Sequence, residues 1–163
     1  MTQKIPVSSS LKENIDYLNQ LFQKDITVKI RQFSNVENSD IRMCVFFVDG
    51  LTSEEFISED IIAPIMHTKQ LQEGTDLFVT VRDRVLIGCN ISCSDDMSEL
   101  LTSFLRGDAI LLTDGHPQGI IISAKNWTIR SVSEPDSERG IQGPHEGFNE
   151  SIMTNLSLIR RKI

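Results

Sequence analysis

The sequence predicts an α/β protein made of two small lobes, with mixed sheets flanked by helices and an amphipathic helix at the end of the chain. Apolar residues recur at helical spacing in some segments and alternate with polar residues in others, which predicts both helices and strands. These segments form two clusters, and a chain of 163 residues has room for two small lobes. We expect the lobes at residues 1–70 and 71–132, followed by a loop and a helix at 133–163.

The first lobe is predicted to begin with a helix and continue with two strands. Ser10 and Glu13 have the spacing of a capping box, and the apolar residues that follow share one helical face over residues 11–23. Apolar and polar side chains alternate over residues 26–31, whereas residues 41–48 form a dense apolar run. Both patterns favour strands, and we expect these two strands to be central and adjacent.

A second helix should complete the first lobe. Thr52 and Glu55 offer another capping box, and a broad apolar face follows over residues 56–66. Pro64 lies within this face, and proline lacks the amide proton of a helical turn, so the helix should kink or divide into two short pieces. Residues 75–85 fit either a helix or a strand, and the spacing of their apolar residues favours a helix.

The second lobe should contain a strand, a helix and a hairpin. Residues 85–91 are predicted as a strand, and Ser94 or Asp95 can cap a helix that ends at Gly107. A turn-rich stretch, residues 114–117, then joins two short apolar strands into a hairpin. This connection is too short for a parallel crossover, which favours mixed sheets over purely parallel ones.

The last part of the chain should contain one more strand and the final helix. Residues 127–132 are predicted as a strand, and residues 133–140 as an exposed connector. The final helix is indicated by apolar residues at spacings of four, four, three and four, namely Phe148, Ile152, Leu156, Ile159 and Ile163.

Composition places the chain among soluble acidic domains. Hydrophobic residues make up 39% and charged residues 24%, and the formal net charge is -7. Because an acidic chain repels nucleic-acid phosphates, we expect no nucleic-acid partner. Residues 1–10 lack the features of an export signal, and three cysteines are an odd number for a secreted disulfide framework. Both observations predict a cytosolic location and reduced thiols.

The sequence offers little support for catalysis or metal binding. It has no G-x-S-x-G, P-loop or G-x-G-x-x-G motif. Cys89 and Cys93 form a local pair without a second pair, and Cys44 lies in an apolar run where a buried thiol is expected. We therefore predict no catalytic residue, no metal and no cofactor. A hydrolase that uses unrecognised acidic residues stays as the enzymatic alternative.

Two features near the C-terminus each have two interpretations. Residues 139–148 contain three glycines and a proline, and this segment could present backbone groups to an anion or could be a tight loop that positions the last helix. Arg160, Arg161 and Lys162 form a basic cluster. Such a cluster suits the cytoplasmic flank of a following membrane helix, and it equally suits a solvated helix end.

Several segments carry a family resemblance in their order along the chain. They are residues 47–51, 59–66, 107–112, Arg130 with 134–135, 143–151 and 155–163. The most specific is Gly-Pro-His-Glu-Gly-Phe-Asn-Glu-Ser at 143–151. Together they resemble the N-terminal soluble domain of the A subunit of bacterial spore germinant receptors, the GerA-type family. Gln142 and His145 depart from the pattern, because relatives usually carry arginine at these positions, and neither side chain offers the guanidinium fork.

The resemblance implies a longer native protein and a membrane setting. It implies that the polypeptide continues past Ile163 into a membrane domain of several helices, with the basic cluster just cytoplasmic of the first span. It further implies partnership with the B and C subunits of the receptor, and with other A subunits, in the spore inner membrane. The present domain would then face the spore core.

Two functional hypotheses follow from these observations. The first is a noncatalytic domain that supports receptor assembly and germination signalling. Its candidate interaction or coupling residues are Glu134, Arg139, Gly143, Pro144, His145, Glu146, Phe148, Arg160 and Arg161. The second is a module that binds a small nutrient germinant in a cleft between the lobes. Its candidate ligand-binding residues are Asp49, Asp114, His116 and Arg130.

Overall fold

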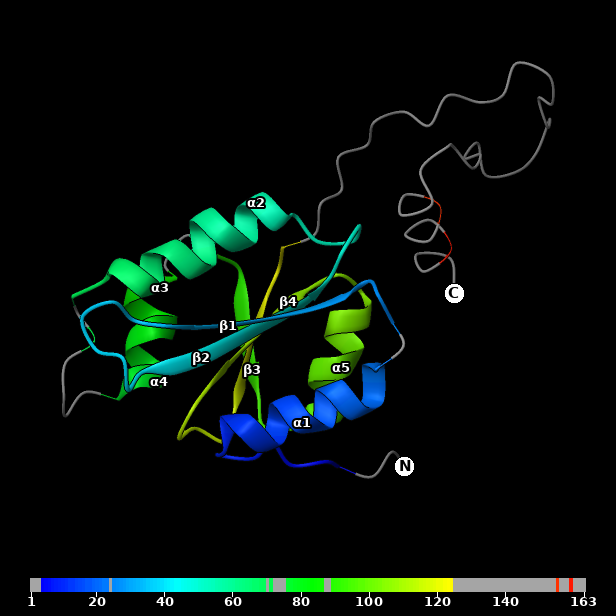
Figure 1. Cartoon of the computed structure of the whole chain (residues 1–163), viewed down its shortest axis with the longest axis horizontal. Coiled ribbons are helices and arrows are strands. Elements are labelled where there is room, and N and C mark those ends of the chain that lie inside the picture. Colours follow the sequence, from blue (N-terminus) through cyan, green and yellow to red (C-terminus); the bar gives the residue numbers. More distant parts are fainter. Residues whose placement is uncertain are drawn as a thin grey trace, which may run out of the picture.

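A computed structural model describes residues 4–23, 25–69, 71, 76–86 and 89–124, together with Asn155 and Ile159. Helices and strands are interspersed along the chain (Figure 1). Two helical segments, η1 and η2, have π-helical hydrogen bonding. The elements are α1 (Leu11–Phe22), β1 (Val28–Ser34), β2 (Arg42–Val48), α2 (Glu54–Phe56), η1 (Ile57–Ile62), α3 (Ala63–His67), α4 (Leu77–Thr80), η2 (Val81–Val85), β3 (Ile91–Ser94), α5 (Met97–Leu105), β4 (Ala109–Thr113) and β5 (Gly119–Ile122).

The five described strands form one sheet in the order β1-β2-β4-β5-β3, and every neighbouring pair is antiparallel. The pairing of β2 with β4 joins the two halves of the chain, with Met43 opposite Thr113 and Phe46 opposite Ile110. The predicted α/β class is therefore confirmed, whereas the predicted two lobes with mixed sheets are wrong. The hydrophobic pattern indicated the strands other than β3, but it carries no information on which distant strands pair.

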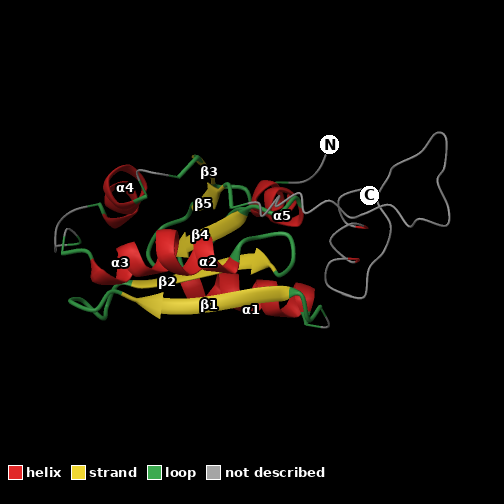
Figure 2. Cartoon of the chain, turned by 90° about the horizontal axis from the view of Figure 1, so that it is seen from above, coloured by secondary structure: helices red, strands yellow, loops and turns green. Residues whose placement is uncertain are grey.

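Helices cover both faces of the sheet. Figures 1 and 2 show α2 and α3 on one side of the strands and α1 on the other side. Successive side chains of β2 point to opposite faces of the sheet. The core on the side of α2, η1, α3, α4 and η2 contains Met43, Val45 and Phe47. The core on the side of α1 and α5 contains Cys44, Phe46 and Val48. Burial on both faces explains why the sequence of β2 is almost continuously apolar.

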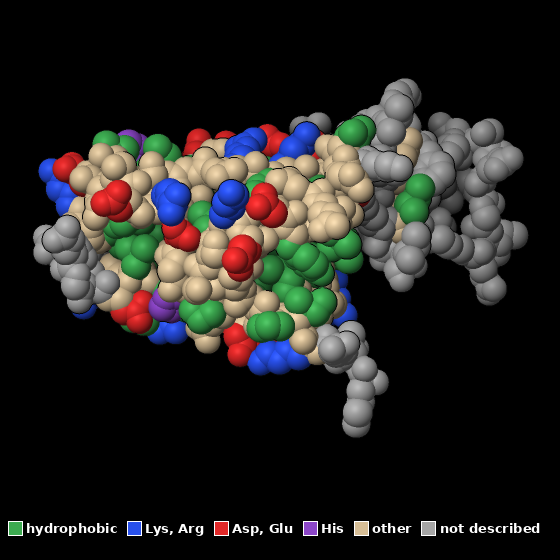
Figure 3. All heavy atoms as spheres, turned by 60° about the horizontal axis from the view of Figure 1, so that its bottom comes forward, with side chains coloured by type: hydrophobic (Ala, Val, Ile, Leu, Met, Phe, Trp, Pro, Cys, Tyr) green, Lys and Arg blue, Asp and Glu red, His purple; other side chains and the backbone are tan. Residues whose placement is uncertain are grey.

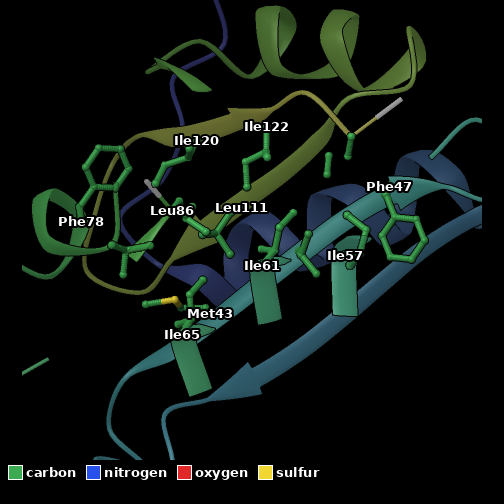
Figure 4. Close-up of a cluster of buried hydrophobic side chains, with 14 of the residues drawn as sticks. Met43, Phe47, Ile57, Ile61, Ile65, Phe78, Leu86, Leu111, Ile120 and Ile122 are labelled. Carbon is green, nitrogen blue, oxygen red and sulfur yellow. The ribbon is translucent and has the colours of Figure 1, made fainter. Parts of the chain in front are cut away.

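The core under α2, η1 and α3 contains a regular row of isoleucines. Ile57, Ile61 and Ile65 are fully buried and follow one another at intervals of four residues along the helical stretch (Figure 4). They face Phe47 and Leu111 of the sheet in the same cluster. Full burial of each such side chain contributes about 1.5 to 3 kcal/mol, so this row is the main anchor of the helical stretch.

The predicted division around Pro64 is confirmed in the hydrogen-bonding pattern, although the backbone stays helical throughout. Ile62 and Ala63 both have right-handed helical dihedral angles. The N–H of Ala63 donates to the carbonyl oxygen of Ser58, five residues earlier, and Pro64 occupies the first turn of α3. Because proline has no N–H, one backbone hydrogen bond of this helical stretch is missing at residue 64, next to the change from π-helical to α-helical bonding.

Several predicted boundaries need correction. Ser10 caps α1 as predicted, but α2 is capped by Ser53, because the neighbouring Thr52 hydroxyl instead donates to the carbonyl oxygen of Gly107. Asp96 caps α5, rather than Ser94 or Asp95. The strand predicted at 85–91 lies at Ile91–Ser94.

Two other predictions from the pattern agree with the described residues, and two concern residues beyond them. Residues 77–85 are helical, as favoured for 75–85, and β4 and β5 form the predicted hairpin. The strand predicted at 127–132 lies outside the described residues, as does most of the final helix. Asn155 and Ile159 are helical and fall within the predicted final helix.

We predict that Asn35→Ala lowers the free energy of unfolding by about 2 to 3 kcal/mol, because buried polar partners lose their hydrogen bonds. The Asn35 side chain is buried and donates to the carbonyl oxygens of Ile65 and Thr68 at 2.7 and 3.0 Å. It also accepts from the amides of Glu37 and Asn38 at 3.0 and 3.1 Å, so it ties the end of β1 to the end of α3. Urea denaturation measures the change.

The matched control is Gln32→Ala, which removes an exposed amide side chain from the same strand. Its unfolding free energy should stay within about 0.5 kcal/mol of the parent. Equal stability of the two variants would show that Asn35 does not brace the fold.

Candidate functional site

Asp114 is the candidate ligand-binding residue with the most contacts in the structure. It follows β4 at the start of the hairpin, and its carboxylate accepts a hydrogen bond from the Leu11 amide at 2.9 Å. The Arg42 guanidinium donates to its other oxygen. The Gly115 amide donates to the carbonyl oxygen of Ser9 at 2.8 Å. We call this group, Asp114 with Arg42, Leu11, Gly115 and Ser9, the Asp114 corner.

The contacts of the Asp114 corner stabilise the charged form of the carboxyl group. The hydrogen bond from Leu11 and the neighbouring Arg42 guanidinium hold the pKa of Asp114 below its usual range, although partial burial acts in the opposite direction. The Asp114 side chain is 25% exposed. Its two oxygens are therefore engaged by the start of α1 and by β2, which is the arrangement of a structural brace rather than an open anion acceptor.

His116 lies at the same end of the sheet as Asp114 but makes different contacts. Its ring stacks on Phe78 of α4, with ring centroids 4.4 Å apart and an interplanar angle of 16°. Its Nε2 lies 3.9 Å from a carboxylate oxygen of Asp76. The histidine thus joins the hairpin to α4, and its ring face is used in packing.

Asp49 does not lie in the same site as Asp114 and His116. It follows the last residue of β2, and in the observed register the end of β2 faces the start of β4. Asp114 follows the end of β4. It lies beside the start of β2, where the Arg42 guanidinium donates to its carboxylate. At about 3.3 Å per residue, the two carboxylates are separated by roughly 20 Å along the strands. Asp49 is therefore not adjacent to Asp114 in the structure.

The remaining candidate residues cannot be placed. Arg130, the fourth proposed ligand-binding residue, lies outside the described residues. The same is true of the whole predicted coupling set: Glu134, Arg139, Gly143, Pro144, His145, Glu146, Phe148, Arg160 and Arg161. Their roles stay predictions.

The three cysteines show no sign of activation. Cys44 is buried as predicted, and burial raises the pKa of its thiol to about 12. Burial also raises the pKa of the Cys89 and Cys93 thiols, although Arg82 acts in the opposite direction at Cys93. A reactive cysteine needs a lowered thiol pKa, so these thiols are poor nucleophiles.

The described residues contain neither a metal-binding cluster nor a membrane-spanning helix. Among these residues, no group of three or more His, Cys, Asp or Glu side chains could hold a metal ion. No helix within the described ranges has the length and apolar character needed to cross a bilayer.

Nothing in the sequence pattern indicated the contact between Arg42 and Asp114. Arg42 was treated only as part of a strand, since its contact with Asp114 joins residues 72 positions apart. The pair Asp114-Gly115 was recognised as turn chemistry, and Gly115 has a φ of 84° as a turn glycine often does. That signal located the hairpin but gave no indication of what the aspartate would contact.

Residues 16–163 match the family model described as Bacillus/Clostridium GerA spore germination protein. Among curated proteins, the chain is 28% identical over 157 residues to Spore germination protein KA of Bacillus subtilis (strain 168), covering 96% of this chain and 29% of that protein. It is 31% identical over 165 residues to Uncharacterized membrane protein YfkQ of the same organism, covering 99% and 31%. The chain therefore spans just under a third of the length of these relatives.

A solved structure shares the fold. It is the N-terminal domain of the A subunit of the Bacillus megaterium spore germinant receptor GerK3, with a TM-score of 0.75 and 22% sequence identity. The match covers 99% of this chain and 57% of that chain. The observed arrangement of helices and strands is thus a fold found in a germinant receptor domain.

We predict that Asp114→Asn lowers the free energy of unfolding by about 1 to 2 kcal/mol at pH 7, because hydrogen bonds to a charged acceptor are lost. The folded-state pKa of Asp114 is depressed, so its contribution is present above the usual aspartate pKa and is lost as the pH falls through the folded value. The difference between parent and variant should therefore shrink below about pH 4. Urea denaturation at pH 7 and pH 3 measures it.

Asp40→Asn is the matched control, since Asp40 is an exposed aspartate in the loop before β2. It should change stability little at either pH. A loss for Asp114→Asn that is the same at pH 7 and pH 3 would contradict the role assigned to the charge.

Proposed function

Because the chain belongs to the Bacillus/Clostridium GerA family of spore germination proteins and has the fold of a germinant receptor A-subunit N-terminal domain, we propose that it supports receptor assembly and carries the germination signal toward the membrane part of the receptor. One observation carries this proposal: the family match extends over residues 16–163, which is almost the whole chain. The family is one of receptors rather than enzymes, in agreement with the expectation from sequence.

The contacts of the candidate residues favour an assembly role over ligand capture. Asp114 and His116 are engaged by other elements of the same domain, and Asp49 lies at the other end of the sheet. A ligand cleft built from these residues would need them to converge. A rigid domain whose polar groups brace its own elements is well suited to holding other chains in a fixed geometry.

The proposed setting is the spore inner membrane, with this domain on the spore-core side. We place the B and C subunits, and other A subunits, as its partners. The membrane would be reached through a segment that follows Ile163, with Arg160 and Arg161 near its cytoplasmic surface. The segment from Glu134 to Phe148 is the proposed coupling surface, with Arg139 and Glu146 in polar contacts with neighbouring protein.

We predict that Val45→Asp in the full-length receptor abolishes nutrient-triggered germination and removes the receptor from the spore membrane. Val45 is fully buried in β2, and an unpaired buried carboxylate prevents the sheet from forming. Immunoblots of spore membranes measure the receptor, and dipicolinic acid release measures germination. Val36→Asp makes the same change at a valine that is 62% exposed and should leave both close to the parent. Normal germination of the Val45→Asp spores would refute the assembly role.

We predict a different result for Glu146→Ala, which alters the proposed coupling surface and changes none of the five described strands. Receptor levels should stay at the parental value while the germination rate falls by about tenfold, the effect of losing about 1.4 kcal/mol of coupling. Glu37→Ala is the control, because Glu37 is an exposed glutamate in a loop of the described domain. If Glu146→Ala spores germinate at the parental rate, the coupling surface lies elsewhere.

Isothermal titration calorimetry tests the rival ligand-binding function. The chain titrated with amino acids, sugars and inorganic ions should give no saturable heat if the domain acts in assembly. Saturable binding that Asp114→Asn weakens would favour the nutrient-binding module instead.

A further inference from the structure

Three large apolar side chains are exposed at one corner of the helical layer that α1 and α5 form. Leu21 and Leu105 are each 50% exposed, and Ile26 is 79% exposed. Figure 3 shows hydrophobic side chains gathered on this face of the molecule. We call Leu21, Ile26 and Leu105 the apolar corner.

Contacts beneath the apolar corner bring its members together. Phe22 follows Leu21 in sequence, and Phe104 precedes Leu105. The centroids of these two phenylalanine rings lie 5.3 Å apart. Phe104 in turn lies 5.1 Å from Phe46 of β2. Ile26 follows α1 in a tight turn, since the Asp25 amide donates to the carbonyl oxygen of Phe22 at 2.9 Å. The apolar corner is thus an outward extension of the buried core.

The chain leaves the described domain near the C-terminal end of α5. The Ser53 amide donates to the carbonyl oxygen of Ala124 at 3.0 Å, and the adjacent Thr52 hydroxyl donates to the carbonyl oxygen of Gly107 at 3.2 Å. Gly107 lies two residues after Leu105. Residues 51–53 therefore hold the end of α5 close to the point where residues 125–163 begin.

Those residues contain an apolar stripe that needs a partner. The spacing of Phe148, Ile152, Leu156, Ile159 and Ile163 predicts a helix with one apolar face. Ile159 is helical and 41% exposed in the structure, so this member of the stripe is left partly uncovered. An amphipathic helix gains most of its stability from burying such a face.

The size of the apolar corner favours a partner on the same chain over a second copy. A stable interface between separate proteins buries about 800 Å² on each side, far more than three exposed side chains provide. A tethered segment needs less contact, because a flexible linker keeps its effective concentration in the millimolar range. In sequence, residues 125–147 connect the described domain to residues 148–163.

We propose that the apolar corner is the docking site for the C-terminal amphipathic segment, residues 148–163 of the same chain. Leu21, Ile26 and Leu105 receive the apolar stripe, with Ile159 among the residues that become buried. This contact would fix the direction in which the segment leaves the domain. It concerns an intramolecular surface and does not depend on the proposed receptor function.

Hydrogen–deuterium exchange of the 163-residue chain, followed by mass spectrometry, tests the docking. In Leu105→Glu, peptides from residues 148–163 should exchange about tenfold faster than in the parent, because a charged side chain opposes the apolar contact. Leu105 is half exposed, so the variant should keep its fold, and peptides from β2 and β4 should retain their protection. Val36→Glu, at an exposed valine on the opposite end of β1, is the matched control and should leave residues 148–163 unchanged.

The reciprocal variant, Ile159→Glu, should increase exchange in peptides that cover the last turns of α1 and α5. Three outcomes would overturn the proposal. The first is free exchange of residues 148–163 in the parent, and the second is protection that Leu105→Glu does not change. The third is protection that rises with protein concentration alongside a dimer in sedimentation velocity, which would make a second copy the occupant.

Discussion

The pairing of β2 with β4 is the interaction on which the rest of the structure depends. It connects strands more than sixty positions apart in the chain, with Met43 opposite Thr113 and Phe46 opposite Ile110. Both strands are buried on both faces, so every helix of the described domain packs against surface that exists only once they have paired. A long-range pairing of this kind must repay its loop-closure entropy through burial. The two helical layers provide that burial.

Polar braces hold the loops in positions that burial alone would leave free. The Asp114 corner fixes the start of α1 to the β4–β5 hairpin and to Arg42 of β2. At the same end of the sheet, the Asn35 side chain joins the end of β1 to the end of α3. Hydrogen bonds have strict geometric requirements, so these residues specify where each helix begins or ends relative to the sheet. The charge on Asp114 makes one of these braces sensitive to acid.

Local features of the fold could be predicted from sequence, and long-range ones could not. The Ser10 cap, the apolar runs of β2 and β4 and the interruption at Pro64 are all consequences of nearby residues, and each agrees with the structure. The single sheet and the contact of Arg42 with Asp114 depend on pairings that the hydrophobic pattern does not encode. The separation of Asp49 from Asp114 could not be predicted for the same reason, since these residues end adjacent antiparallel strands at opposite ends of the sheet. The family resemblance depended on ordered motifs instead, and it was confirmed.

The same architecture limits where other proteins can bind. Both faces of the sheet are covered by helices, and β1 is an edge strand whose charged residues are already engaged. Arg31 lies over the Phe47 ring and contacts Glu54, while Lys29 lies 3.8 Å from a carboxylate oxygen of Asp49. Charged side chains on an edge strand discourage another strand from pairing there. Strand pairing with another chain is therefore disfavoured at β1, and contacts at the helix ends would leave the core of the domain closed.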